Sequence, residues 1–100
     1  MNIPTIVKEE VNKILPMSEV ILFGSRARND FRSDSDWDFL ILLAIPNLNK
    51  EIKNEILDRL YEVELKTDAV ISSLIFSKTE WEKRSVMPIY KIIQEEGIAA

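Results

Sequence analysis

Apolar residues recur along this chain with two different spacings, and the alternation between them predicts its elements. Spacings of three and four residues, which line one face of a helix, occur over residues 4–15, after Asn49 and after Pro88. Short apolar runs typical of buried strands cover residues 19–23, 36–43 and 66–75. Because helices and strands alternate, we expect an α/β or α+β fold, with a small mixed sheet of about three strands flanked by helices.

Residues that favour helix ends support these boundaries. Pro4 suits a first helical turn, and Asn49 can cap the helix that follows it. Ser77 and Glu80 match the capping-box pattern of a further short helix, and Gly97 is a typical stop for the last one. The spacing predicts that the inner faces of the two later long helices carry Ile52, Ile56, Leu57, Leu60 and Tyr61, and Ile89, Ile92 and Ile93.

The composition narrows the chemistry that the chain can perform. We expect the 100 residues to form one domain, residues 1–100, and the net charge of −4 disfavours nonspecific nucleic-acid binding. Cysteine and histidine are both absent from the sequence, so a metal ion would need oxygen ligands, which suit magnesium, manganese or calcium. Because the sequence shows neither a secretory signal nor an apolar run of about 20 residues, we expect a cytoplasmic protein.

Two aspartates stand at the entrance of the second predicted strand. Asp36 and Asp38 are two positions apart, so their carboxylates share one face, with Cα atoms roughly 6.5 Å apart. Carboxylates held this closely repel each other unless a cation or a proton lies between them. Leu40 and Leu42 continue the same face, which places the pair at the mouth of an apolar surface. The alternative is two solvated acids at a strand end.

A glycine-serine turn lies between the first strand and a short predicted helix at residues 25–28. Gly24 lets the backbone approach a ligand closely, and a helix start such as Ser25 offers free amides to phosphate. Turns use this dipeptide widely, so alone it is a weak signal. Arg26 could neutralise phosphate or be structural, whereas we expect Arg28 to pair with nearby acids.

Asp68 is a third acidic candidate, within the apolar run that predicts the third strand. A charged residue there needs a partner or a metal ion, or else faces water from an edge strand. If the third strand lies beside the second, Asp68 could complete a site of three carboxylates. Trp37 falls on the face opposite Asp36 and Asp38, so we expect it to pack in the core.

Together these motifs resemble the signature of the minimal nucleotidyltransferases, small members of the DNA polymerase beta-like nucleotidyltransferase superfamily. The resemblance rests on residues 24–28 (Gly-Ser-Arg-Ala-Arg), 35–39 (Ser-Asp-Trp-Asp-Phe) and 66–70 (Lys-Thr-Asp-Ala-Val), and it extends over nearly the whole chain. Asn29 stands where the family usually has glycine, and asparagine tolerates the left-handed backbone that such a turn needs.

The resemblance implies a mechanism and assigns residues to it. Gly24, Ser25 and Arg26 would bind the nucleotide, which is expected to be ATP. Asp36 and Asp38 would bind two magnesium ions. Asp68 would bind one of these ions and help to activate the attacking hydroxyl, in an in-line displacement at the α-phosphate.

The resemblance also implies a partner. The smallest bacterial members are often MntA-type antitoxins that transfer AMP from ATP to a tyrosine of a HEPN-domain toxin. We therefore expect an acceptor supplied by a partner protein, in a toxin–antitoxin pair. Two alternatives stay open: nucleotidyl transfer to a small acceptor such as an aminoglycoside with a partner subunit, and a non-catalytic module that only binds the toxin.

Overall fold

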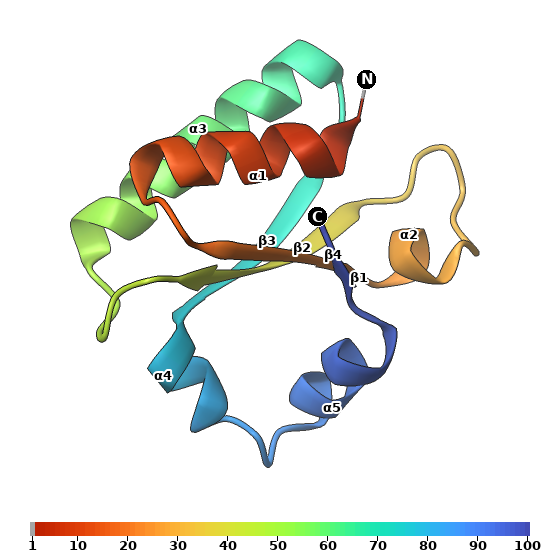
Figure 1. Ribbon diagram of the computed structural model, residues 1–100. Coiled ribbons are helices and arrows are strands. Elements are labelled where there is room, and N and C mark those ends of the chain that lie inside the picture. The colour runs from red at the N-terminus through yellow and green to blue at the C-terminus, as the bar shows by residue number, and fades with distance from the viewer. Residues whose placement is uncertain (1) are drawn as a thin grey trace.

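The computed structural model describes residues 2–100 and confirms the expected alternation of helices and strands (Figure 1). In chain order the elements are α1 (Ile3–Ile14), β1 (Glu19–Phe23), α2 (Ser25–Arg28), β2 (Trp37–Leu43), α3 (Lys50–Thr67), β3 (Ile71–Ser77), α4 (Lys78–Glu82), α5 (Pro88–Glu96) and β4 (Ile98–Ala99).

The strands form one mixed sheet with the order β3-β2-β1-β4. β1 runs antiparallel to both β2 and β4, whereas β2 and β3 are parallel and connected through α3. The short strand β4 extends the expected three strands to four. It has only two residues and therefore no periodicity by which a sequence pattern could reveal it.

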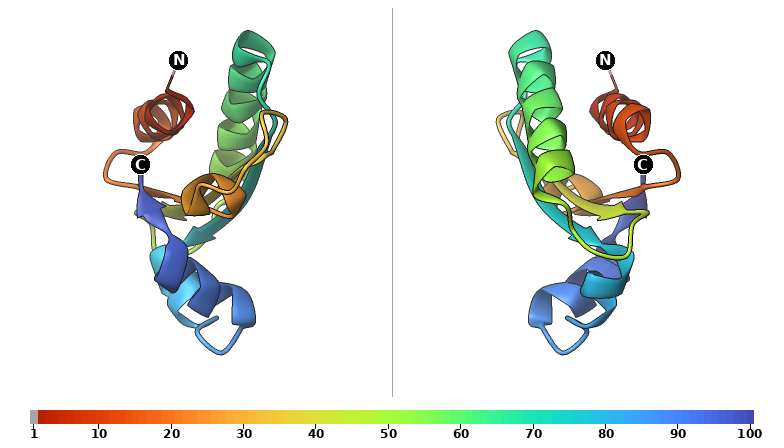
Figure 2. Two further views of the ribbon diagram at one scale, coloured as in Figure 1. Left: turned by 90° about the vertical axis from the view of Figure 1, so that its right-hand side faces the viewer. Right: turned by 90° about the vertical axis from the view of Figure 1, so that its left-hand side faces the viewer.

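Helices cover both faces of the sheet (Figure 2). On one face α1 and α3 pack over a core that contains Val7, Val11, Phe39, Ile41, Leu43, Ile56 and Leu60. On the other face α4 and α5 pack over a smaller core of Leu40, Leu42, Trp81, Tyr90 and Ile93. The central strand β2 is buried on both faces, which explains why its sequence is a continuous apolar run.

Side-chain caps fix the helix starts where the sequence predicts them. The Asn49 side chain accepts hydrogen bonds from the amides of the first turn of α3, at 2.8 and 3.3 Å. Ser77 and Glu80 form both bonds of the capping box, each at 3.1 Å, at the start of α4. These bonds satisfy amides that have no partner within their own helix.

The third strand begins at Ile71, so the expectation of a strand over residues 66–75 is confirmed for residues 71–75 and wrong for residues 66–70. α3 continues through Thr67, and Asp68 ends it in the left-handed conformation, with a φ angle of 60°. The Glu64 carboxylate accepts a 2.8 Å hydrogen bond from the Ile71 amide, which ties the end of the helix to the start of β3. Asp68 therefore caps a helix and lies outside the sheet.

The inner faces of the helices are only partly as predicted. Ile56, Leu60 and Ile93 are buried, but Leu57 and Tyr61 of α3 are 40% and 60% exposed, and Ile92 of α5 is 44% exposed. The buried side of α3 continues instead through Val63. Among the helices of residues 2–100, none combines the length and the apolar character needed to cross a membrane.

Candidate functional site

The two aspartates meet at the end of the sheet where β2 begins. Asp36 is exposed just before the strand, and Asp38, its second residue, is half-buried on the face that α4 and α5 cover. Asp38 pairs in register with Phe23 of β1 on one side and with Ser72 of β3 on the other. Trp37 points to the opposite face and packs against the larger core, as predicted.

The surroundings of Asp38 disfavour the charged form of its carboxyl group. Burial raises its pKa above the usual range, and the charge of Asp36 raises this pKa further, while Arg28 partly offsets both effects. Burial and the charge of Asp36 both make a cation beside the pair favourable.

Gly24 connects β1 to α2 and lies directly against Asp38. Its φ angle of +78° is one that side-chain-bearing residues rarely adopt, and a β-carbon here would overlap the Asp38 carboxylate. The glycine is thus needed both for the turn and for the close approach of the carboxylate. Ser25 follows as the first residue of α2, and Asn29 ends this helix with a φ angle of 64°, which confirms the expected left-handed turn.

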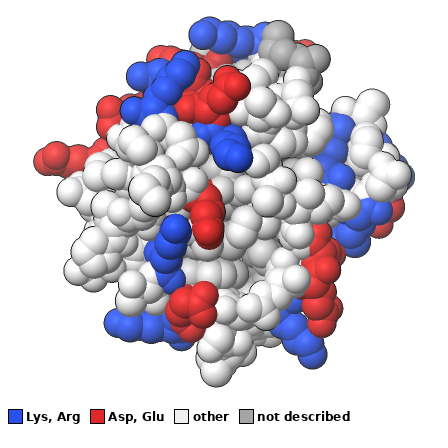
Figure 3. Space-filling view, in the orientation of Figure 1, with Lys and Arg blue, Asp and Glu red and all other residues white. Residues whose placement is uncertain are grey.

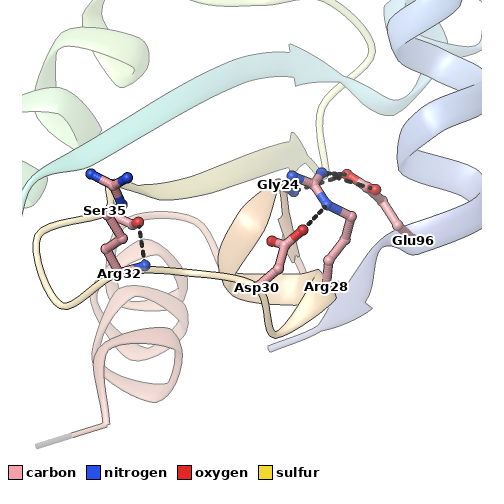
Figure 4. Close-up of polar contacts among 6 residues, drawn as sticks. All are labelled: Gly24, Arg28, Asp30, Arg32, Ser35 and Glu96. Atoms are coloured by element: carbon pink, nitrogen blue, oxygen red, sulfur yellow. Dashed lines mark hydrogen bonds and ion pairs between the residues drawn. The ribbon is translucent and has the colours of Figure 1, made fainter.

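Glu96, at the end of α5, binds the same turn (Figure 4). Its Oε1 accepts a 3.0 Å hydrogen bond from the Gly24 amide, and both of its oxygens accept from Nη1 of Arg28 at 3.2 Å. Arg28 also donates from Nε to Asp30 at 3.2 Å, so the predicted pairing of Arg28 with nearby acids is confirmed. Glu96 lies 72 positions from Gly24, and no local signal in the sequence identifies it.

Arg26 stabilises the loop between α2 and β2. Its guanidinium lies 4.4 Å from the ring centre of Phe31 and 4.3 Å from that of Trp37, and it donates to the carbonyl oxygens of Ser33 and Ser35. The Ser35 hydroxyl in turn accepts from the Arg32 amide at 2.9 Å (Figure 4). Its Nε and Nη2 are thus engaged within the loop, and the predicted contact of Arg26 with a nucleotide stays a prediction.

The structure does not bring Asp68 to the aspartate pair. Asp68 lines a cavity of about 480 Å³ with Arg26, Trp37 and Lys66, whereas Asp38 lines a different one of about 420 Å³. Within residues 2–100, no three acidic side chains are grouped closely enough to hold a metal ion together. The role of Asp68 as the third carboxylate of the site stays a prediction.

The donor set nevertheless fits one divalent cation. Magnesium is commonly held by one or two carboxylates together with substrate phosphates, and the pair of Asp36 and Asp38 offers those carboxylates next to the turn that connects β1 to α2. Acidic and basic side chains also lie side by side at the end of the molecule that carries α2 (Figure 3). Arg28 at this end is already paired with Asp30 and Glu96, so the pair of Asp36 and Asp38 is the part that suits a cation.

Comparisons with known proteins agree with this geometry. The family model described as "Nucleotidyltransferase domain" matches residues 4–99. Two proteins of Methanocaldococcus jannaschii, each named "Putative protein adenylyltransferase", are similar in sequence. One is 39% identical over 79 residues, covering 78% of this chain and 72% of that protein. The other is 28% identical over 102 residues, covering 97% and 96% respectively.

Solved structures show the same fold. One, named "Crystal structure of the toxin-antitoxin with AMP-PNP", superimposes with a TM-score of 0.69 and 15% identity, over 98% of this chain and 72% of that chain. A second, a mutant of the toxin-antitoxin MntA-HpeT, gives a TM-score of 0.66 and 14% identity, over 99% and 71%. At such identities the likeness is one of fold.

Proposed function

The chain belongs to the nucleotidyltransferase domain family and has the polymerase beta-like fold, and on that premise we propose that it transfers AMP from ATP to a hydroxyl group of a partner protein. The observation that carries this proposal is the carboxylate pair of Asp36 and Asp38, held against the Gly24 turn. The names of the two relatives from M. jannaschii support a protein as the acceptor.

Each residue of the site has a proposed role. Asp36 and Asp38 hold Mg²⁺, which when bound neutralises phosphate charge and orients the leaving group. Gly24 and Ser25 receive the triphosphate at the start of α2. The acceptor oxygen attacks the α-phosphorus, the bond to the β-phosphate oxygen breaks, and pyrophosphate leaves. Because the chain has no histidine, its carboxylates are the groups available to accept the hydroxyl proton.

The proposed partner is a toxin, and the chain is its antitoxin. Both structural neighbours come from toxin–antitoxin pairs, one of them with AMP-PNP, and the mutant carries two aspartate-to-glutamate changes two positions apart, the spacing of Asp36 and Asp38. In this proposal a HEPN-domain toxin supplies a tyrosine hydroxyl, and the pair acts in the cytoplasm.

A second function is supported by the finding that no three acidic side chains of residues 2–100 are grouped closely enough to hold a metal ion together. A domain with an incomplete site could neutralise the toxin by binding alone, without transferring a nucleotide. The two functions differ in what they require of Asp36 and Asp38, because only transfer depends on these carboxylates.

Co-expression with the toxin distinguishes these functions. The wild-type chain should relieve toxicity, and mass spectrometry should find an adenylyl group (AMP less one water) added to a toxin tyrosine. The double variant Asp36→Asn and Asp38→Asn should still be produced but should neither modify nor neutralise the toxin. If the double variant neutralises as well as the wild type, transfer is not the function, and the binding module replaces it.

A further inference from the structure

Ser72 is the nearest polar neighbour of Asp38 across the sheet. β2 and β3 run parallel, with Asp38 in register with Ser72 and Leu40 in register with Leu74. Partners in register point to the same face of a sheet, and Asp38, Ser72 and Leu74 accordingly line the same cavity of about 420 Å³. The neighbour on the other side, Phe23, offers no ligand atom.

Ser72 therefore occupies the position at which a third carboxylate could reach the pair. Two divalent cations side by side at roughly 3.5–4 Å need several anionic ligands to offset their repulsion. Asp36 and Asp38 are sufficient for one ion that also binds phosphate. A neutral hydroxyl does not offset the charge of a second ion, and Asp68 lies in the other cavity.

We infer that this site binds a single divalent cation with its nucleotide, and that Ser72 is the residue that limits the site to one. The inference rests on the proposed nucleotide-binding site and concerns the number of ions it holds. Ser72 is exposed at the start of β3, so an aspartate can be placed there without burying a charge in the core.

Counting bound manganese tests this inference without measuring transfer. The chain is dialysed to equilibrium against Mn²⁺ and a saturating nonhydrolysable ATP analogue, and the excess of Mn²⁺ in the compartment that holds the chain gives the number of ions bound per chain. The wild type should bind one Mn²⁺ per chain, and Ser72→Asp should bind two. Ser72→Asn introduces a side chain with the shape of aspartate but without its charge, and this variant should still bind one Mn²⁺. Asp68→Asn, a change compatible with the left-handed conformation, should leave the wild-type count unaltered.

The outcomes separate this inference from the proposed function. Two ions in the wild type, or a count that falls in Asp68→Asn, would overturn the inference and restore Asp68 as a ligand. One ion in both the wild type and a folded Ser72→Asp would also overturn it. If the wild type binds neither Mn²⁺ nor the analogue, the proposed function fails first. The wild-type count alone decides the matter if Ser72→Asp does not fold.

Discussion

At the scale of single residues, Gly24 is required for two reasons that mutation can separate: its backbone conformation and its contact with Asp38. Gly24→Ala should destabilise the chain by about 1–3 kcal/mol, because its backbone conformation is one that only glycine adopts readily and the new methyl group meets the Asp38 carboxylate. Thermal and urea unfolding measure this loss. Adding Asp38→Ala removes the overlap but leaves the backbone strain, so the double variant should recover part of the stability. Full stability in Gly24→Ala alone would contradict both reasons.

Asp38 should make stability depend on pH in a specific direction. Its pKa is raised in the folded chain, mainly by burial and then by Asp36. The folded state therefore favours the protonated form, and this favourable contribution is complete below the usual carboxyl pKa and is lost as the pH rises through the raised value. Asp38→Asn should thus be more stable than the wild type at neutral pH, by less than about 1 kcal/mol because solvent screens the site.

Melting temperatures measured from acidic to neutral pH check this prediction. The advantage of Asp38→Asn should shrink as the pH falls. Asp58→Asn, which removes the same charge from the exposed surface of α3, serves as the matched control and should show no such trend. Equal pH profiles for the two variants would mean that the surroundings of Asp38 are not responsible.

At the scale of elements, α5 is tied to α2 through one side chain. Glu96 is only 18% exposed and binds both the Gly24 amide and Arg28. Glu96→Gln keeps an acceptor for the amide and should cost about 0.5–1.5 kcal/mol, whereas Glu96→Ala also leaves the Gly24 amide without its partner and should cost about 1–3 kcal/mol. Urea unfolding distinguishes these costs, with the exposed neighbour change Glu95→Gln as control. Equal stability for Gln and Ala would show that the amide bond contributes nothing.

The elements also show which features of the fold can be predicted from sequence. The caps at Asn49 and Ser77 depend on residues three positions apart or fewer, and their signals were sufficient. The sequence pattern does not show the end of α3, because Asp68, rather than glycine, adopts the left-handed conformation, and the residues after Val63 are therefore equally typical of a strand. Once the strand was placed too early, its register to β2 could not be predicted.

At the scale of the whole molecule, the site is assembled at one end of the sheet from separate parts of the chain. The turn after β1, the start of β2, the start of β3 and the end of α5 meet there. The sequence predicted the first two parts because they lie within 15 residues, Gly24 to Asp38. Ser72 and Glu96 reach the site only through strand register and helix packing, which no local pattern encodes.

Because the whole chain supports this site, ligand binding should appear as a gain in global stability. Ligand that binds only the native state adds about 2.7 kcal/mol at about 100 times its Kd, which for a domain of this size corresponds to a rise of about 10 °C or more in melting temperature. We expect this rise for the wild type with Mg²⁺ and a nonhydrolysable ATP analogue together. Asp36→Asn without ligand should melt at the same temperature or higher, since one of two repelling charges is gone, and it should not respond to the ligand. An equal response in both proteins would place the nucleotide elsewhere on the chain, and no response in the wild type at millimolar ligand would favour the module that binds its toxin without a nucleotide.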